Sequence, residues 1–293
     1  MRLAVGVLVL LALALVAPAL APYDPKLSVA GALEPPSRAH LLGANDIGQD
    51  ELSILLWGAR ASLVVAVGMT ALATAVAWPL GIVAGLSRRA EAPILALTDL
   101  LLALPPLPLY ILVLTLVGPT LPHVVLTLGL LSWAVFCRVV RAQVIAARGA
   151  PYVEAARCLG ASWVRVGRVH LLPGTLALLP ANLVVTVRLA VFAEATLGFL
   201  GLGDPAVTTW GAALGTAFAD PLLFTTPAWT WLVVPPSAGI GLLVLGSAWL
   251  GTRLARQGTQ RAVSPANDAS YAAAKARERA FSRSWPMRPL RWT

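Results

Sequence analysis

The sequence predicts an all-α polytopic membrane protein with six transmembrane helices, and three observations lead to this prediction. The 293-residue chain is 58% hydrophobic and only 12% charged, and its mean hydropathy is +0.79. Several nearly uncharged stretches have about 20 residues, the length that a helix needs to cross a bilayer core of about 30 Å. The basic residues are confined to a few segments, as the positive-inside rule describes for cytoplasmic loops.

The six expected spans follow the apolar runs of the chain, which are 3–21, 58–86, 93–117, 122–147, 175–201 and 229–252. Residues 1–21 imitate a signal peptide because small residues end the run, so cleavage is an alternative to retention as the first span. We favour retention because further apolar runs follow.

The remaining segments complete the expected domain organisation. Residues 22–57 are rich in proline, glycine and acids and form an extracytoplasmic segment. Residues 58–252 form a five-span core that contains a cytoplasmic loop at 148–174. Residues 253–293 form a basic cytoplasmic tail with a possible short helix near 272–281, for which membrane lipid headgroups are one partner and a solvated, disordered state is the alternative.

The net charge of +9 could suggest nucleic-acid binding, but the positions of the basic residues indicate the orientation of the chain in the membrane. Most of the bases lie at Arg2, in a short hinge at Arg88 and Arg89, in one middle stretch from Arg138 to Arg168, and in the tail. No aromatic and basic stacking surface accompanies them, as single-stranded nucleic-acid binding would need. Both termini are therefore expected in the cytoplasm.

Proline interrupts the third expected span at 104–108. Inside a helix bundle, neighbouring helices or a wet cavity can satisfy the carbonyl groups that lose their partners. The cluster is compatible with a kink that lines a transport pathway and equally with a bend that only fits the bundle.

Among the ionisable residues inside expected spans, we single out Asp99, Arg188 and Glu194 as candidate functional or structural residues. Each costs roughly 2.5 to 3.5 kcal/mol at the bilayer centre on insertion scales, so each is expected to face protein or water. Arg188 and Glu194 are six positions apart, which places them on opposite faces of one helix, so a direct pair is not expected. Asp99 is expected to be structural, whereas Glu194 either lines the translocation pathway or makes a structural pair.

The loop at 148–174 has the pattern of a helix, a glycine stop and a second helix. Glu154 lies in the first turn after Pro151, where a carboxylate suits the positive end of the helix dipole. Gly160 can adopt the left-handed conformation that ends a helix. The second helix is expected to carry Arg165 toward the anionic leaflet, so that it lies along the membrane face as a short amphipathic helix.

This loop resembles the EAA loop of bacterial ABC importer permeases. That pattern is Glu-Ala-Ala, a glycine four residues after the second alanine, and then Leu-Pro, and the chain has each of these elements at that spacing. The string YVEAARCLGAS, with His170 ahead of Leu-Pro, is similar to the dipeptide, oligopeptide and nickel branch. The resemblance implies that the loop is a coupling helix for an ATPase, with the coupling residues Glu154, Ala155, Ala156, Gly160, Ala161, Ser162, Arg165 and Pro173. We expect Pro173 to start the next span.

Two further segments support this branch. Residues 194–203 with 209–211 resemble its fifth span and the loop that follows, and residues 40–50 with 58–63 resemble its extracytoplasmic motif. The chain departs from that motif at Gln49, where the family usually has arginine, which leaves the solute subtype and the partner contacts open.

The resemblance implies a type I ABC importer permease fold and a subunit that forms half of the translocation pathway for peptides or related solutes. It also implies a bacterial inner-membrane location. The implied partners are a second homologous permease, two cytoplasmic ATPases that bind ATP and Mg, and an extracytoplasmic solute-binding protein.

The chain itself is expected to be no enzyme and to hold no cofactor or metal. Its two lysines, Lys26 and Lys275, lie outside any phosphate-binding glycine loop, and Cys137 and Cys158 match no zinc or redox spacing. Two alternatives remain. An ion-coupled secondary transporter would usually show internal repeats and mid-membrane charges. A membrane enzyme or a non-transport assembly protein would need a polar cluster at one face.

Overall fold

The computed structural model describes residues 16–221 and 223–262. Helices make up all the secondary structure described there, apart from two isolated β-bridges, Ser28 to Gln49 and Ala44 to Asp50. The chain divides into a main body, residues 1–251, and a C-terminal segment, residues 252–293. The expected short helix near 272–281 lies outside the described residues.

The helices run in chain order as follows: η1 Ala17–Leu20, α2 Glu51–Leu86, α3 Arg88–Ala103, α4 Pro106–Val117, α5 Leu121–Leu131, α6 Trp133–Arg148, α7 Pro151–Cys158, α8 Trp163–Val166, η2 Gly167–Leu171, α9 Leu172–Thr175, η3 Leu176–Leu178, α10 Leu179–Phe199, α11 Trp210–Ala219, η4 Leu223–Thr225, α12 Trp229–Leu232 and α13 Val234–Ala262.

Four helical stretches in the described part of the chain are long and apolar enough to cross a membrane: Glu51–Leu86, Leu121–Arg148, Leu179–Phe199 and Trp229–Trp249. The bent pair α3 and α4 makes a fifth crossing if it counts as one span. The expected first span at 3–21 falls mostly on residues that the structure does not describe. The all-α polytopic fold is therefore shown, while the number of six spans stays a prediction.

The expected span at 93–117 is bent at its proline cluster, as the sequence predicted. The structure breaks it into α3 and α4, which meet at an angle of 93°. Leu104 precedes a proline and is extended, with φ −90° and ψ 136°, and Pro105 follows with ψ 126°. Proline lacks an amide hydrogen and disfavours the helical conformation of the residue before it, so the helix cannot pass this point.

Two other helix starts differ from the sequence prediction. α2 begins at Glu51, well before the apolar run at 58, because the side chain of Asp50 caps it by accepting a hydrogen bond from the Ser53 amide at 2.8 Å. The long helix that follows the loop at 148–174 is α10, which begins at Leu179. The sequence predicted a start at Pro173, which lies in the single turn α9. Pro180 in the first turn of α10 is suited to such a start, since it has no amide hydrogen to satisfy.

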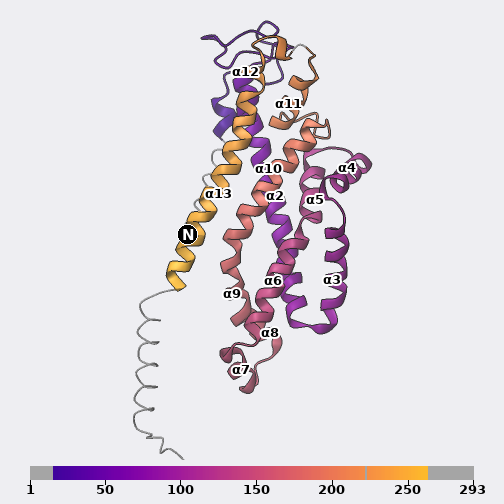
Figure 1. Ribbon diagram of the computed structural model, residues 1–293, viewed down its shortest axis with the longest axis vertical. Helices are drawn as coiled ribbons and strands as arrows, with labels where there is room; N and C mark the ends of the chain where they lie inside the picture. The colour runs from indigo at the N-terminus through magenta and orange to yellow at the C-terminus, as the bar shows by residue number, and fades with distance from the viewer. Residues whose placement is uncertain (1–15, 222, 263–293) are drawn as a thin grey trace, which may run out of the picture. The chain divides into compact units, whose positions relative to one another are not determined.

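α2 is the central helix of the main body and packs against α5, α6 and α10 (Figure 1). It meets α6 through small residues spaced four apart, Ala77, Gly81 and Gly85. A Cβ atom on Gly81 would lie 2.7 Å from the Cys137 carbonyl oxygen, and one on Gly85 would lie 2.5 Å from Cγ1 of Val144. The close approach of the two helices therefore depends on missing side chains, as is usual for packed transmembrane helices.

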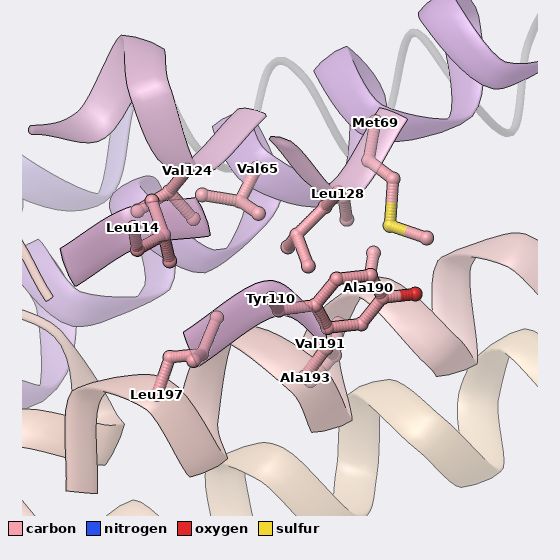
Figure 2. Packing of buried hydrophobic residues seen from close by; sticks show 11 residues of the cluster. Val65, Met69, Tyr110, Leu114, Val124, Leu128, Ala190, Val191, Ala193 and Leu197 are labelled. Carbon is pink, nitrogen blue, oxygen red and sulfur yellow. The ribbon is translucent and has the colours of Figure 1, made fainter. Parts of the chain in front are cut away.

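A hydrophobic cluster joins α2, α4, α5 and α10 (Figure 2). Its buried members are Val65, Ala66, Met69, Tyr110, Leu114, Val124, Leu128, Ala190, Val191, Ala193 and Leu197. The hydroxyl groups of Tyr110 and Ser132 are 2.8 Å apart and hydrogen-bonded. Despite the break before it, α4 thus folds back onto the bundle and buries part of its surface there.

Candidate functional site

The loop at 148–174 has the predicted helix, glycine stop and second helix. Pro151 begins α7, and Glu154 lies in its first turn. Gly160 has φ +85° and a Cβ atom there would meet nothing within 4 Å, so its backbone conformation and not crowding requires glycine. Ser162 then caps α8 by accepting a hydrogen bond from the Arg165 amide at 3.3 Å.

The loop is anchored to the bundle by a few side chains that point inward. Val153 of α7 and Val166 of α8 are 1% and 0% exposed and belong to the same buried cluster as Val140 and Val144 of α6. α7 closes with a hydrogen bond from the Ala161 amide to the Ala156 carbonyl at 3.0 Å. These contacts give the loop a fixed conformation.

Trp163 adds an anchor that the sequence prediction did not include. The guanidinium carbons of Arg148 and Arg157 lie 5.1 and 4.7 Å from the centre of its indole ring, within the range of cation–π contacts. Arg148 also donates a hydrogen bond to the Gly85 carbonyl at 2.9 Å. The loop is therefore connected directly to the end of α2.

The outer surface of the loop carries the predicted coupling residues. The exposed ones are Glu154, Ala155, Gly160, Ser162, Arg165 and Pro173, while Ala156 and Ala161 are half-buried. Between them Leu159 is 89% exposed and Val164 is 66% exposed. This apolar tip lies at one end of the main body, and α11 and α12 lie at the other end (Figure 1). An exposed apolar tip of this kind is suited to contact with a partner surface.

Arg138 and Arg141, which were counted with the basic middle stretch but fall within the expected span at 122–147, lie inside α6. Arg138 pairs with Asp99 of α3 and donates from Nε to the Thr98 hydroxyl at 3.1 Å. Arg141 pairs with Glu91 of α3, with Nε at 3.1 Å from Oε1. The helix continues through both arginines because each finds a carboxylate on a neighbouring helix. These pairs support the structural role that was expected for Asp99.

Glu194 lies at a junction of three helices. It is on α10 and only 4% exposed, and the Ser62 hydroxyl of α2 donates a hydrogen bond to its Oε2 at 2.9 Å. The Thr209 side chain also hydrogen-bonds to this carboxylate. Thr209 in turn caps α11, where it accepts a hydrogen bond from the Ala212 amide at 3.1 Å. Arg188 is exposed elsewhere on α10, and no ion pair joins it to Glu194 among the described residues.

The helices around this junction approach so closely that two glycine positions leave no room for a Cβ atom. Trp210 donates from its indole nitrogen to the Leu55 carbonyl at 2.8 Å, and a Cβ on Gly58 would lie 2.5 Å from the Trp210 ring. A Cβ on Gly211 would lie 2.3 Å from the Ala195 carbonyl oxygen. The sequence analysis assigned residues 58–63 to one motif and residues 194–203 with 209–211 to another. The structure packs the two motifs together as one unit.

A family model described as "Binding-protein-dependent transport system inner membrane component" matches residues 77–257. The di/tripeptide transport system permease protein DppC of Pseudomonas aeruginosa is 35% identical over 250 residues, which cover 82% of this chain and 81% of that protein. A putative peptide permease protein of Brucella ovis is 33% identical over 236 residues, covering 80% and 77%. A putative peptide transport system permease protein of Brucella suis is 32% identical over 253 residues, covering 84% of each chain.

Proposed function

This chain belongs to the family of inner membrane components of binding-protein-dependent transport systems, and we propose that it is the permease subunit of an ATP-driven importer of peptides. In this proposal it forms half of the translocation pathway beside a second, homologous permease. Two cytoplasmic ATPases bind ATP and Mg, so this chain needs no cofactor, and an extracytoplasmic binding protein delivers the solute. Both termini are cytoplasmic, as the distribution of basic residues indicates.

The exposed tip of the loop at 148–174 carries this proposal. The Leu159 side chain points away from the helix bundle and is exposed, although the loop around it is anchored by the buried side chains of Val153 and Val166. A leucine that points away from its own fold is suited to an apolar groove on a partner, where its burial contributes about 1.5 to 3 kcal/mol. We infer that this partner is the ATPase.

The contacts behind the tip support mechanical coupling. Force on α7 and α8 reaches α6 through Val153 and Val166, and reaches α2 through the Arg148 hydrogen bond to the Gly85 carbonyl. Since α2 packs against α5, α6 and α10, a displacement of the loop can shift the central helix against its neighbours. Alternating access of the pathway would follow from such a shift when the ATPases close on ATP.

The proposal for the class of solute is based on the names of the related proteins. Their names assign di/tripeptide or peptide transport to them, and the motifs at 40–50 and 194–203 resemble the same branch. We therefore propose peptides as the solute of this chain.

Recovery of the ATPase with the purified complex tests the coupling. Leu159→Asp places a charge at the centre of the proposed contact, which weakens the binding free energy by about 2 to 5 kcal/mol. When the ATPase concentration is limiting, the amount of ATPase recovered should therefore fall by more than about tenfold. Leu41→Asp is the matched control, since Leu41 is also well exposed but lies in the segment at 22–57. Equal recovery with both variants would contradict the proposal. Absence of any ATPase from the wild-type preparation would favour a secondary transporter or an assembly protein.

The orientation of the loop can be tested with a native residue. Cys158 is exposed in α7 and Cys137 is buried. A membrane-impermeant maleimide should therefore label the chain in inside-out vesicles stripped of the ATPases and leave it unlabelled in intact spheroplasts. Cys158→Ser should abolish the labelling, and labelling from the outer side would overturn the proposed topology.

A further inference from the structure

A cavity of about 430 Å³ lies between the start of α2, the end of α10 and α11. α11 lies at the end of the main body opposite to α7 and α8 (Figure 1). The volume is within the range of about 300 to 1,000 Å³ that is usual for ligand pockets. Small residues leave this space open, since its walls include Gly198, Gly201, Gly203, Ala212 and Ala213.

Glu51 is the unusual residue of this cavity. It is the first residue of α2, it lines the cavity, and it is only 3% exposed. Its Oε2 atom has no hydrogen-bond partner among the described residues. Buried carboxylates in native proteins nearly always have a partner, and an unpaired one is costly. The structure therefore contains an acceptor whose partner is missing.

Two other polar side chains of the cavity wall have partners of their own. Asp204 accepts hydrogen bonds from the Leu121 and Ala206 amides, both at 2.8 Å. Asn45 accepts from the Gln49 amide at 2.8 Å and donates to the Gln49 side chain at 2.9 Å. The Glu51 Oε2 atom remains an acceptor that a group entering the cavity can use.

The charges around Glu51 indicate that this group is a cation. The neighbouring Asp50 is fully buried and already bonded to His40 and to Ser53. Asp46 and Asp220 line a smaller cavity that Glu51 also borders. This acidic surrounding disfavours any anion next to the Glu51 carboxylate, and a protonated amine would offset it.

Lys26 gives the cavity a second charge of opposite sign. Its exposed side chain lines the same cavity, and none of the ion pairs found in the described ranges includes it. A zwitterionic solute, with an ammonium group at one end and a carboxylate at the other, matches an acid and a base that share one cavity.

We propose that this cavity is a subsite for zwitterionic peptides, in which Glu51 accepts a hydrogen bond from the α-ammonium group and Lys26 faces the terminal carboxylate. The inference rests on the proposed function for the identity of the solute as a peptide. It goes beyond that function because it places a solute-selective group in the permease itself, at the end away from the loop at 148–174.

The test is ligand protection of a cysteine in the intact complex, reconstituted in liposomes without the binding protein. Thr216→Cys supplies an exposed reporter that lines the cavity, in a Cys158→Ser background. L-alanyl-L-alanine should slow labelling by N-ethylmaleimide by a factor of one plus the ratio of its concentration to its dissociation constant, which is about elevenfold at a ratio of ten. N-acetylated dialanine should give no protection at the same concentrations.

Glu51→Gln should weaken the protection by dialanine at least about tenfold, because the amide keeps an acceptor oxygen but lacks the negative charge that strengthens its hydrogen bond to an ammonium group. Glu34→Gln is the matched control in the same segment, since the Glu34 carboxylate accepts a hydrogen bond from the Gly31 amide and does not line the cavity. Lys26→Gln tests the other end independently, because it should remove the preference for dialanine over dialanine amide.

Equal protection by dialanine and its N-acetylated form, or no protection by either, would overturn the subsite. So would unchanged protection in Glu51→Gln. ATP-driven uptake with the binding protein added is measured on the same liposomes and tests the proposed function separately. Protection without uptake would keep the subsite and reject the importer, and uptake without protection would do the reverse.

Discussion

The hydrogen bond at the Glu194 junction predicts an effect on the thermal stability of the chain that can be measured without any partner subunit. Ser62→Ala removes the hydroxyl that donates to the buried Glu194 carboxylate at 2.9 Å, across 132 positions of sequence. Leaving a buried acceptor without its donor costs about 1 to 3 kcal/mol of stability. With about 2 to 4 °C per kcal/mol, the melting temperature should fall by roughly 2 to 12 °C.

Ser247→Ala is the matched control. Ser247 is a half-buried serine of α13 whose hydroxyl bonds only to the Val244 carbonyl of its own helix, so the same substitution should change stability by about 0.5 kcal/mol or less. Thermal unfolding of the purified chain in detergent, followed by size-exclusion chromatography, gives both values. Equal melting temperatures for Ser62→Ala and Ser247→Ala would refute the reasoning.

A double-mutant cycle assigns the effect to the pair and separates two roles of Glu194. Ser62→Ala and Glu194→Gln should be non-additive, with a coupling energy of about 0.5 kcal/mol or more, because Ser62→Ala removes and Glu194→Gln alters the same hydrogen bond. If Glu194 is structural, Glu194→Gln lowers the melting temperature and leaves uptake by the assembled complex near wild type. Lost uptake at an unchanged melting temperature would place Glu194 in the translocation pathway instead.

Three further predictions concern the contacts that hold the helices together. Gly81→Val should weaken the packing of α2 on α6 by about 1 to 3 kcal/mol, whereas Gly241→Val, where an added Cβ meets nothing within 4 Å, should cost less than about 1 kcal/mol in the same melting assay. Glu91→Arg should lower the yield of folded protein, and the charge-swapped double variant with Arg141→Glu should recover it, which expression followed by size-exclusion chromatography measures. Trp210→Phe should destabilise the chain by about 0.5 to 1.5 kcal/mol, because the partly buried Leu55 carbonyl of α2 loses the second hydrogen bond that it accepts, and an unchanged melting temperature would show that water replaces the indole.

The membrane fold and the form of the loop at 148–174 could be predicted from the sequence, because both depend on local properties. Transfer of an apolar run of about 20 residues into a bilayer is favourable wherever the run lies in the chain. A proline before Glu154 and a glycine at 160 act on the backbone of their own neighbours, so their effect does not need the rest of the fold. The family resemblance rested on the same short motifs, and the family match confirmed it.

The side-chain partners were decided only by the tertiary structure. Nothing in the spacing of Ser62 and Glu194 indicates that they bond, and the cation–π contacts of Trp163 and the pairing of Arg138 with Asp99 also depend on which helices become neighbours. The open acceptor at Glu51 is visible only when the cavity around it is known. Helix formation responds to residues a few positions apart, whereas these contacts join residues that come together only after the helices have packed.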